Sequence, residues 1–325
     1  MKIRRIVISK VRSKRIVMMF LMGHVCGLPL SAQYDPAFSQ YWDMQTFYNP
    51  ATSGLSGKLN VEAAYAMQLV GFENAPATLY AGVDLPVFFL NPKHGMGVGF
   101  LSDEAGLFAH KKFYLQYAYH QPLWGGSLSG GIRFGMLSEG FDGSGLDLAD
   151  SSDPAFPTSD VSGAGFDLDF GLYYKHKDWY AGVSAFHLTG PEIAYGEEKN
   201  NQISVPQTFY FFGGYNISFK NPLFKMYTSA MFRSDFMVYR GDISCRVAYE
   251  GGRINLYGGF SYSPTNSVTL LFGGKVMGVS LGYSYEMYTS AIGALNGSHE
   301  ITLSYQTDLN LFKKGKNKHK SVRIL

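Results

Sequence analysis

Between residues 57 and 309 the chain consists of short segments in which apolar and polar side chains alternate, and this alternation limits the fold more than any other feature. Residues 279–286 read Val-Ser-Leu-Gly-Tyr-Ser-Tyr-Glu, so one face would carry valine, leucine and two tyrosines, and the other serine, glycine and glutamate. Successive side chains of a strand point in opposite directions, which gives strands with two unlike faces a period of two. No window of useful length shows a helical period. We therefore predict an all-β chain.

Glycine, proline, asparagine and aspartate divide this region into about fourteen strand segments. An even number is what bacterial single-chain outer-membrane barrels require, although the boundaries also allow twelve or sixteen strands. The expected strands are residues 57–69, 76–86, 94–102, 111–121, 126–138, 164–175, 178–188, 206–218, 224–235, 240–250, 253–263, 267–275, 278–287 and 298–309.

The connections between these segments alternate roughly between short and long. Those at residue 177, at 251–252 and at 276–277 are tight, whereas 139–163, 189–205 and 288–297 are long and fall on the other side. Outer-membrane barrels have short periplasmic turns and longer extracellular loops. The alternation therefore predicts that both termini lie in the periplasm.

Composition favours a closed, antiparallel transmembrane β-barrel over three alternatives. Charged residues are 16% of the chain, against about 25% in typical soluble proteins. Aromatic residues are also 16%, which is too many for a disordered chain. Beyond residue 32 there is no apolar run of the roughly 18 residues that a membrane helix needs. We predict one barrel over residues 57–312, located in the outer membrane and in contact with its lipid.

The N-terminal residues 1–32 have the pattern of a signal peptide, with a basic start, an apolar run over residues 16–30 and a small residue at Ala32. An N-terminal membrane anchor is the alternative. The whole chain has a net charge of +3, and removal of seven basic residues leaves −4. The tail, residues 313–325, carries +6, so the body between is −10. Nucleic acid is therefore not an expected partner, and the tail is either a solvated end or a periplasmic docking segment.

Residues 33–56 are aromatic without the period of a strand. Phe38, Tyr41, Trp42, Phe47 and Tyr48 would be costly to leave in water. We expect this stretch to fold into the periplasmic mouth of the barrel and to narrow it, as a plug.

Charged side chains recur on the polar face of the predicted strands, which in a membrane barrel points into the lumen. Two interpretations remain open for them: they pair with one another and brace the interior, or they line a permeation path. By parity the lumen-facing charges include Glu62, Asp84, Arg133, Asp167, Asp169, Arg246, Glu286 and Glu300.

No catalytic, cofactor-binding or metal site is predicted. Ser298, His299 and Glu300 suggest a hydrolase at first sight, but neighbours on a strand point to opposite faces and cannot form one proton relay. The acidic stretch 139–163 does not have the spacing of a calcium-binding EF-hand loop, and we expect it to be a solvated surface loop.

Two groups of residues near the ends of the mature chain resemble the PorP/SprF family of outer-membrane proteins. The first reads Asp-Pro-Ala-Phe-Ser-Gln-Tyr at residues 35–41, followed by Asn-Pro-Ala at 49–51, and the second reads Gly-Ser-His-Glu-Ile at 297–301. An Asn-Pro pair common in the family is replaced here by Asp43-Met44-Gln45. The motif residues that carry the resemblance are Asp35, Pro36, Phe38, Ser39, Gln40, Tyr41, Asn49, Pro50, Gly297, His299 and Glu300.

The resemblance implies a protein of the type IX secretion and gliding machinery of Bacteroidota that is not an enzyme. Family members support the secretion or surface attachment of particular cargo. The implied partners are the secretion machinery, a large surface adhesin and a periplasmic OmpA-like peptidoglycan-associated lipoprotein. The alternative is a passive porin or a transporter of hydrophobic solutes, because fold alone does not determine function.

Overall fold

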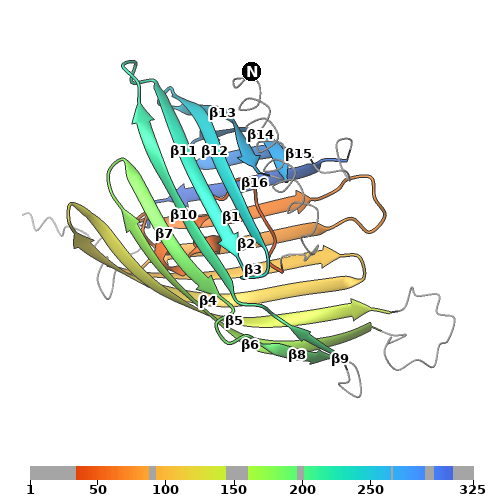
Figure 1. Ribbon diagram of the computed structural model, residues 1–325. Coiled ribbons are helices and arrows are strands. Elements are labelled where there is room, and N and C mark those ends of the chain that lie inside the picture. Colours follow the sequence, from red (N-terminus) through yellow and green to blue (C-terminus); the bar gives the residue numbers. More distant parts are fainter. Residues whose placement is uncertain are drawn as a thin grey trace, which may run out of the picture. The chain divides into compact units, whose positions relative to one another are not determined.

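The computed structural model describes residues 34–87, 93–143, 160–195, 201–264, 266–289 and 296–309. The expected signal peptide (1–32) and basic tail (313–325) lie outside the described residues. The described residues form sixteen strands: β1 (Leu59–Met67), β2 (Ala77–Pro86), β3 (His94–Ala105), β4 (Phe108–Leu123), β5 (Gly126–Asp142), β6 (Asp160–Lys175), β7 (Trp179–Phe186), β8 (Glu192–Tyr195), β9 (Asn201–Ser204), β10 (Thr208–Ser218), β11 (Phe224–Ser234), β12 (Tyr239–Glu250), β13 (Ile254–Ser263), β14 (Ser267–Val276), β15 (Val279–Tyr288) and β16 (Ser298–Thr307). Figure 1 shows how they are arranged.

Fourteen of these strands form a closed antiparallel barrel, which confirms the predicted fold class and strand number. Each barrel strand pairs with the next one along the chain, and β7 pairs with β10 because β8 and β9 form a separate two-stranded sheet. The barrel closes where β1 pairs with β16, from Leu59 opposite Thr307 to Met67 opposite His299. Closure leaves the barrel without the free strand edges that an open sheet would expose to lipid.

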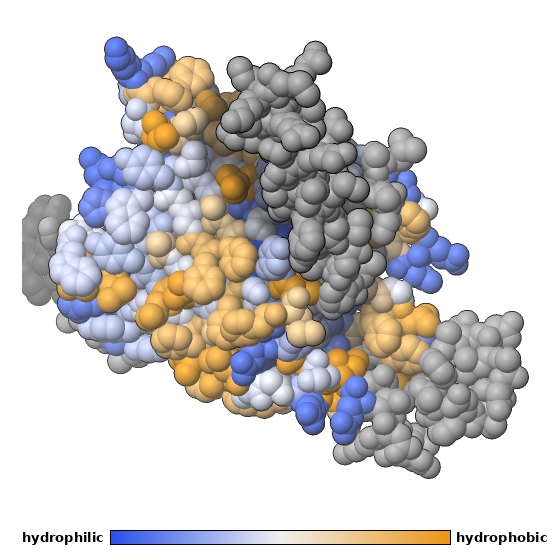
Figure 2. Space-filling view, in the orientation of Figure 1, coloured by the Kyte–Doolittle hydropathy of each residue, from blue (hydrophilic) through white to orange (hydrophobic). Residues whose placement is uncertain are grey.

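The outer face of the wall is apolar, as a membrane requires. Figure 2 shows apolar side chains spread over the face of the strands turned to the viewer. Leu115, Phe134, Phe170 and Leu281 are each between 45% and 56% exposed on the strands that carry them. Their sequence neighbours point inward and are buried, apart from the half-buried Ser280. The alternation read from the sequence therefore separates side chains that face lipid from side chains that face the lumen.

The two ends of the barrel differ in their connections. The short-turn end, where β1 begins and β16 ends, carries the turns 124–125, 176–178, 219–223, 251–253 and 277–278. The long-loop end carries the connections 143–159, 187–207 and 289–297, together with shorter ones such as 106–107. The tight and long connections predicted from the sequence fall on opposite ends, as expected.

Four neighbouring strands, β3 to β6, extend three or four residues further toward the long-loop end than predicted. β4, β5 and β6 are 16, 17 and 16 residues long, whereas β7 has 8. The pairing of β6 with β7 stops where Phe170 faces Ala185, although β6 continues to Asp160 beside β5. The stretch 139–163 is therefore not one solvated loop. In particular Glu139 lies in β5, is buried, and contacts the ring of His110.

The connection 187–207, predicted as a plain loop, contains the hairpin of β8 and β9. Ile193 of β8 is fully buried with Leu137 of β5 and Val205. A side chain at Gly163 or Gly165 of β6 would collide with Ile193, so the hairpin lies against the inner face of β6. Two short helical turns, α2 (Gln45–Tyr48) and η1 (Pro50–Thr52), precede β1. None of the described helices is long and apolar enough to cross a membrane.

Candidate functional site

Residues 34–56, here called the lumen segment, lie inside the barrel and run from one end to the other. Tyr34 donates a hydrogen bond to Glu139, close to the long-loop end of β5. At the other extreme, the backbone oxygen of Ser53 accepts a hydrogen bond at 2.9 Å from His120, near the short-turn end of β4. Gly54 then leads into β1. The segment thus passes the depth of the barrel instead of only narrowing one mouth.

Aromatic side chains of the lumen segment form the core of the molecule. Phe38, Tyr41, Trp42, Phe47 and Tyr48 are each at most 5% exposed and pack against inward-facing residues of the wall. The Phe47 ring meets those of Phe38 and Tyr48 edge-on, with ring centres 5.4 and 4.8 Å apart. Burial of these rings is the largest apolar contribution to holding the segment in place.

Asp35 fixes the beginning of the segment through buried charges. Its carboxylate lies 3.1 Å from His187 Nε2 and accepts a hydrogen bond at 2.7 Å from the Tyr210 hydroxyl. The Asp35 backbone oxygen accepts a further bond from Arg233 at 3.1 Å. Asp35 is buried, so an imidazole, a hydroxyl and a guanidinium together surround its polar atoms in place of water.

The network continues from His187 into β6 and β4. His187 Nδ1 lies 3.0 Å from Asp167, and the ammonium of Lys112 bridges Asp167 and Asp169 at 2.6 and 2.8 Å. Asp167, Asp169 and His187 are close enough together to hold a metal ion. The Lys112 ammonium supplies a positive charge there, while Asp167 Oδ1 accepts no hydrogen bond among the described residues.

Glu300 caps the first turn of the lumen segment. Its carboxylate accepts hydrogen bonds from the backbone N–H groups of Ser39 at 2.6 Å and Gln40 at 3.1 Å. A side chain at Gly282 would meet the amide of Gln40, so the turn lies directly against β15. The two motifs that carry the family resemblance, which are 261 residues apart at this contact, thus meet in space.

Arg133 holds the middle of the segment. Its guanidinium donates to the backbone oxygens of Thr46 at 2.6 Å and Phe47 at 2.8 Å, and lies 3.3 Å from Asp169. On the opposite side the Thr46 hydroxyl donates to Glu62 at 2.6 Å. The carbonyl oxygens at the short helix α2 are therefore satisfied by a buried cation of the wall.

Asn49 and Pro50 fit into a notch made by glycines. Asn49 Nδ2 donates to the backbone oxygens of Leu172 at 3.0 Å and Val183 at 3.1 Å, and its Oδ1 caps η1 by accepting from the N–H of Ala51. A side chain at Gly131 would collide with the backbone of Pro50 and Ala51, and side chains at Gly171 and Gly182 would collide with Asn49. Only a wall without side chains at these places lets the backbone of η1 approach so closely.

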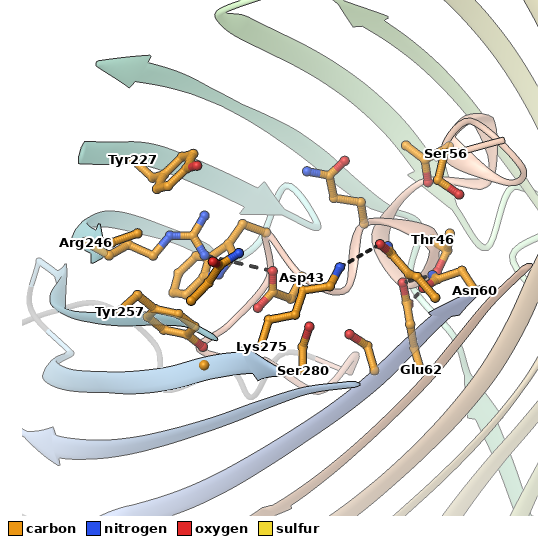
Figure 3. Close-up of a pocket in the computed structure, with 18 of the residues that line it drawn as sticks. Asp43, Thr46, Ser56, Asn60, Glu62, Tyr227, Arg246, Tyr257, Lys275 and Ser280 are labelled. Carbon is orange, nitrogen blue, oxygen red and sulfur yellow. Dashed lines mark hydrogen bonds and ion pairs between the residues drawn. The ribbon is translucent and has the colours of Figure 1, made fainter. Parts of the chain in front are cut away.

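Near the short-turn end, the lumen segment and the wall enclose a chamber of about 410 Å³. Figure 3 shows Arg246, Tyr227 and Tyr257 at one side of it, and Asn60 and Glu62 at the other. The guanidinium of Arg246 lies 4.0 Å from the centre of the Trp42 ring and 4.0 Å from an Asp43 carboxylate oxygen. Arg246 thus holds the segment at Trp42 by stacking as well as by charge.

The predicted residues do not all meet in this site. Among the predicted lumen charges, only Arg133 and Asp169 pair directly with each other, while most of the others contact the lumen segment or its anchors. Glu286 does not: it pairs with Arg240 at 2.9 Å. His299 points to the outer face, where it bonds to the Tyr283 hydroxyl. Gly297 accepts a backbone bond from Val70 and is too close to Tyr285 for a side chain.

Several anchors were not predicted, namely Lys112, His187, Tyr210 and Arg233. Alternate residues of a strand share a face, and this rule places Lys112, Tyr210 and Arg233 on the inner face of their strands. The sequence therefore contained a signal for three of the four anchors. His187 follows the last residue of β7 and has a left-handed backbone (φ 57°), which no strand pattern indicates.

Comparisons with known proteins identify one matching family and several solved structures of similar fold. The family model described as "Type IX secretion system membrane protein PorP/SprF" matches residues 30–305. No match is found among curated proteins. Similar solved structures include the toluene transporter TbuX of Ralstonia pickettii (TM-score 0.46, 12% identity, 81% of this chain and 92% of that one). A mutant of the monoaromatic hydrocarbon channel TodX (0.47, 10%, 81% and 94%) and Omp33 of Acinetobacter baumannii (0.40, 8%, 77% and 97%) are further examples.

Proposed function

The chain belongs to the PorP/SprF family of type IX secretion system membrane proteins, and from this premise we propose that it is a non-enzymatic accessory of type IX secretion in the outer membrane. It would support the secretion or surface attachment of a large adhesin, in a gliding-related role. One rigid unit would present a surface to the adhesin outside the cell and another to the secretion machinery and an OmpA-like lipoprotein in the periplasm.

One observation carries this proposal: the lumen is occupied by a segment of the chain that is bonded to the wall on many sides. Hydrogen bonds reach the segment from β1, β2, β4, β5, β6, β7, β10, β11, β12, β13 and β16. A diffusion pore needs a water-filled path through the lumen. A scaffold instead needs a rigid body whose two ends keep a fixed distance and orientation to each other. The anchored segment favours the scaffold.

The lengths of the connections support one orientation of the barrel in the membrane. Because extracellular loops are the longer ones, we place the long-loop end at the cell surface and the short-turn end in the periplasm. The adhesin would then meet the loops around β4, β5 and β6, and the periplasmic partners would meet the turns beside the chamber. The same placement puts the end of β16 in the periplasm, but it puts Tyr34, the first described residue, at the cell-surface end of the lumen. The expectation that both termini are periplasmic is therefore kept in this proposal only for the C-terminal side.

The decisive experiment is deletion of the gene, followed by comparison of the surface and secreted proteomes with those of the parent strain. We expect one or a few large surface proteins to disappear while uptake of small solutes is unchanged. Re-expression of the intact chain is the control and restores them. Unchanged surface proteins together with impaired uptake of a solute would overturn the proposal in favour of a transporter.

A porin remains the second candidate, and planar-bilayer recordings of the purified barrel test it directly. The accessory proposal expects no steady single-channel current from the intact chain. It expects current to appear in a variant whose lumen segment has been displaced, such as Gly131→Val. Steady current through the intact chain would favour the porin.

A further inference from the structure

The chamber at the short-turn end contains two buried carboxylates that have no cation among the described residues. Glu62 and Asp84 are 7% and 3% exposed, and both line the chamber. Asp84 accepts hydrogen bonds from Gly54 N–H at 2.7 Å and from Asn60 Nδ2 at 2.9 Å, and Glu62 accepts from Thr46. None of these donors carries a charge. Buried carboxylates are costly unless a positive charge faces them.

The other acids that line the chamber already have cations. Glu250 pairs with Lys225 at 2.7 Å, and Asp43 lies 4.0 Å from Arg246. Lys175 and Lys275 also line the chamber, but among the described residues neither forms an ion pair with Glu62 or Asp84, and the Lys275 ammonium donates to Gln306 at 3.0 Å. The negative charge that lacks a counterpart is therefore confined to Glu62 and Asp84.

Three further polar atoms of residues that line the chamber lack hydrogen-bond partners among the described residues, and one of them is Arg246 Nε. Asn60, which lies between the two carboxylates, is 5% exposed, and its Oδ1 accepts no hydrogen bond. Trp42, also 5% exposed, has an Nε1–H that donates none. A buried acceptor and a buried donor without partners are rare in folded proteins. They fit a ligand that brings a cationic donor to Asn60 and a carbonyl acceptor to Trp42, which is what a basic peptide offers.

We propose that the chamber binds the basic C-terminal tail of the same chain, with a lysine ammonium placed at Glu62 and Asp84. The tail is the nearest candidate because β16 ends at the chamber: its inward-facing Ser304 and Gln306 line it, and the described chain stops at Leu309. Residues 313–325 carry six basic and no acidic side chains. Charge and position therefore both favour this occupant.

The reach of the chain selects the first lysines of the tail. Lys313, Lys314 and Lys316 lie four, five and seven residues beyond Leu309, and an extended chain covers about 3.3–3.6 Å per residue. Roughly 13 to 25 Å is then available, enough to turn back into the chamber. Its volume lies within the range of about 300–1,000 Å³ that holds small ligands, so it has room for a few residues and not for the whole tail.

Zero-length carbodiimide crosslinking of the intact purified chain tests the proposal, because it joins an ammonium to a carboxylate only where the two are in contact. Peptide mapping should find Lys313, Lys314 or Lys316 joined to Glu62 or Asp84. The E62Q/D84N variant should lose these products. Two outcomes would overturn the proposal. In the first, Lys175 or Lys275 is crosslinked to Glu62 or Asp84; in the second, the crosslink joins these carboxylates to a second molecule of the chain.

A binding measurement covers the case in which the carboxylates do not react. A fluorescent peptide of residues 310–325 is added to the full chain that carries K313Q/K314Q/K316Q, so that its own tail does not compete. We expect saturable binding that weakens with salt and falls at least tenfold in E62Q/D84N. Two peptides with equal loss of charge provide the matched comparison: the K313Q/K314Q/K316Q replacement should abolish binding, and the K318Q/K320Q/R323Q replacement should largely preserve it.

Either of two results would overturn the proposal: no binding by the intact sequence, or equal effects of the two triple replacements. Equal effects would mean that the tail senses only overall charge. The outcome does not depend on the secretion role, since binding of the tail is measured on the purified chain while the secretion role is measured in cells.

Discussion

The two halves of the lumen segment are held by different physics. Residues 35–40 are held by charge, through Asp35 at His187 and through the carboxylate of Glu300. Residues 49–54 are held by shape, with η1 set into the glycine notch at Gly131. The difference teaches that charged anchors can bring together residues from distant strands, whereas close backbone contact requires that side chains be absent at particular places. The first half should respond to loss of a charge and the second to gain of a side chain.

The largest expected effect is loss of the Asp35 charge. Asp35→Asn leaves His187 and Lys112 facing too few carboxylates in a buried site, and removal of one partner of a buried ion pair costs about 3–5 kcal/mol. Hydrogen exchange of the backbone amides at residues 35–40 should reveal this as easier local opening. Tyr210→Phe, which removes one hydrogen bond to Asp35 and keeps the charge, should cost only about 1 kcal/mol. Equal effects of the two substitutions would contradict a charge-based anchor.

The second effect tests shape. In Gly131→Val a side chain would enter within 2.5 Å of the Ala51 Cα, so η1 must leave the notch. Overpacking of this kind costs about 1–3 kcal/mol, and we expect the upper part of that range because the obstacle is backbone. Limited proteolysis should then cut within residues 49–56.

Gly130→Val is the matched control for the notch. Gly130 precedes Gly131 on the same strand but faces outward, with Leu172 Cδ2 at 3.7 Å from an added Cβ. Its proteolysis should resemble that of the unsubstituted chain. If both valines expose the segment equally, general damage to β5 explains the result and the notch does not.

A smaller effect is expected at the capped turn. Glu300→Gln keeps the shape but weakens two hydrogen bonds that a carboxylate makes with the N–H groups of Ser39 and Gln40, at a cost of about 2 kcal/mol. Faster hydrogen exchange of those two amides measures the loss. His299→Gln alters the neighbouring residue on the outer face and should leave both amides protected.

The smallest effect is expected outside the lumen. Lys58 and Asp308 join the start of β1 to the end of β16 across 3.7 Å, but their side chains are 46% and 75% exposed. Exposed ion pairs contribute about 0–1 kcal/mol. Asp308→Asn should therefore change unfolding in urea very little, and a change comparable to that of Asp35→Asn would mean that burial does not decide the strength of these anchors.

The fold followed from the sequence because its governing signal is local. Alternation within ten residues separates lipid from lumen, and the connections at 177 and 251–252 could be read directly. Contacts of the lumen segment could not be read in this way: Ser39 meets Glu300 only after the barrel has closed, and neither residue carries a local sign of the other. Glu139 was assigned to a loop because acidic residues follow it, although the His110 that faces it lies on a different strand.

The course of the lumen segment has a mechanical consequence. The segment begins with Tyr34 at the long-loop end and joins β1 at the short-turn end, so the strands of the barrel surround it along its length. A pull on the chain at Tyr34 would load the buried ion pair of Asp35 first and the cap of Glu300 next, before any force reached β1. A pull from the short-turn end would instead load the contacts of Gly54 and Asn49 first. The two directions of force should thus meet different first barriers, a buried charge at one end and a backbone set among glycines at the other.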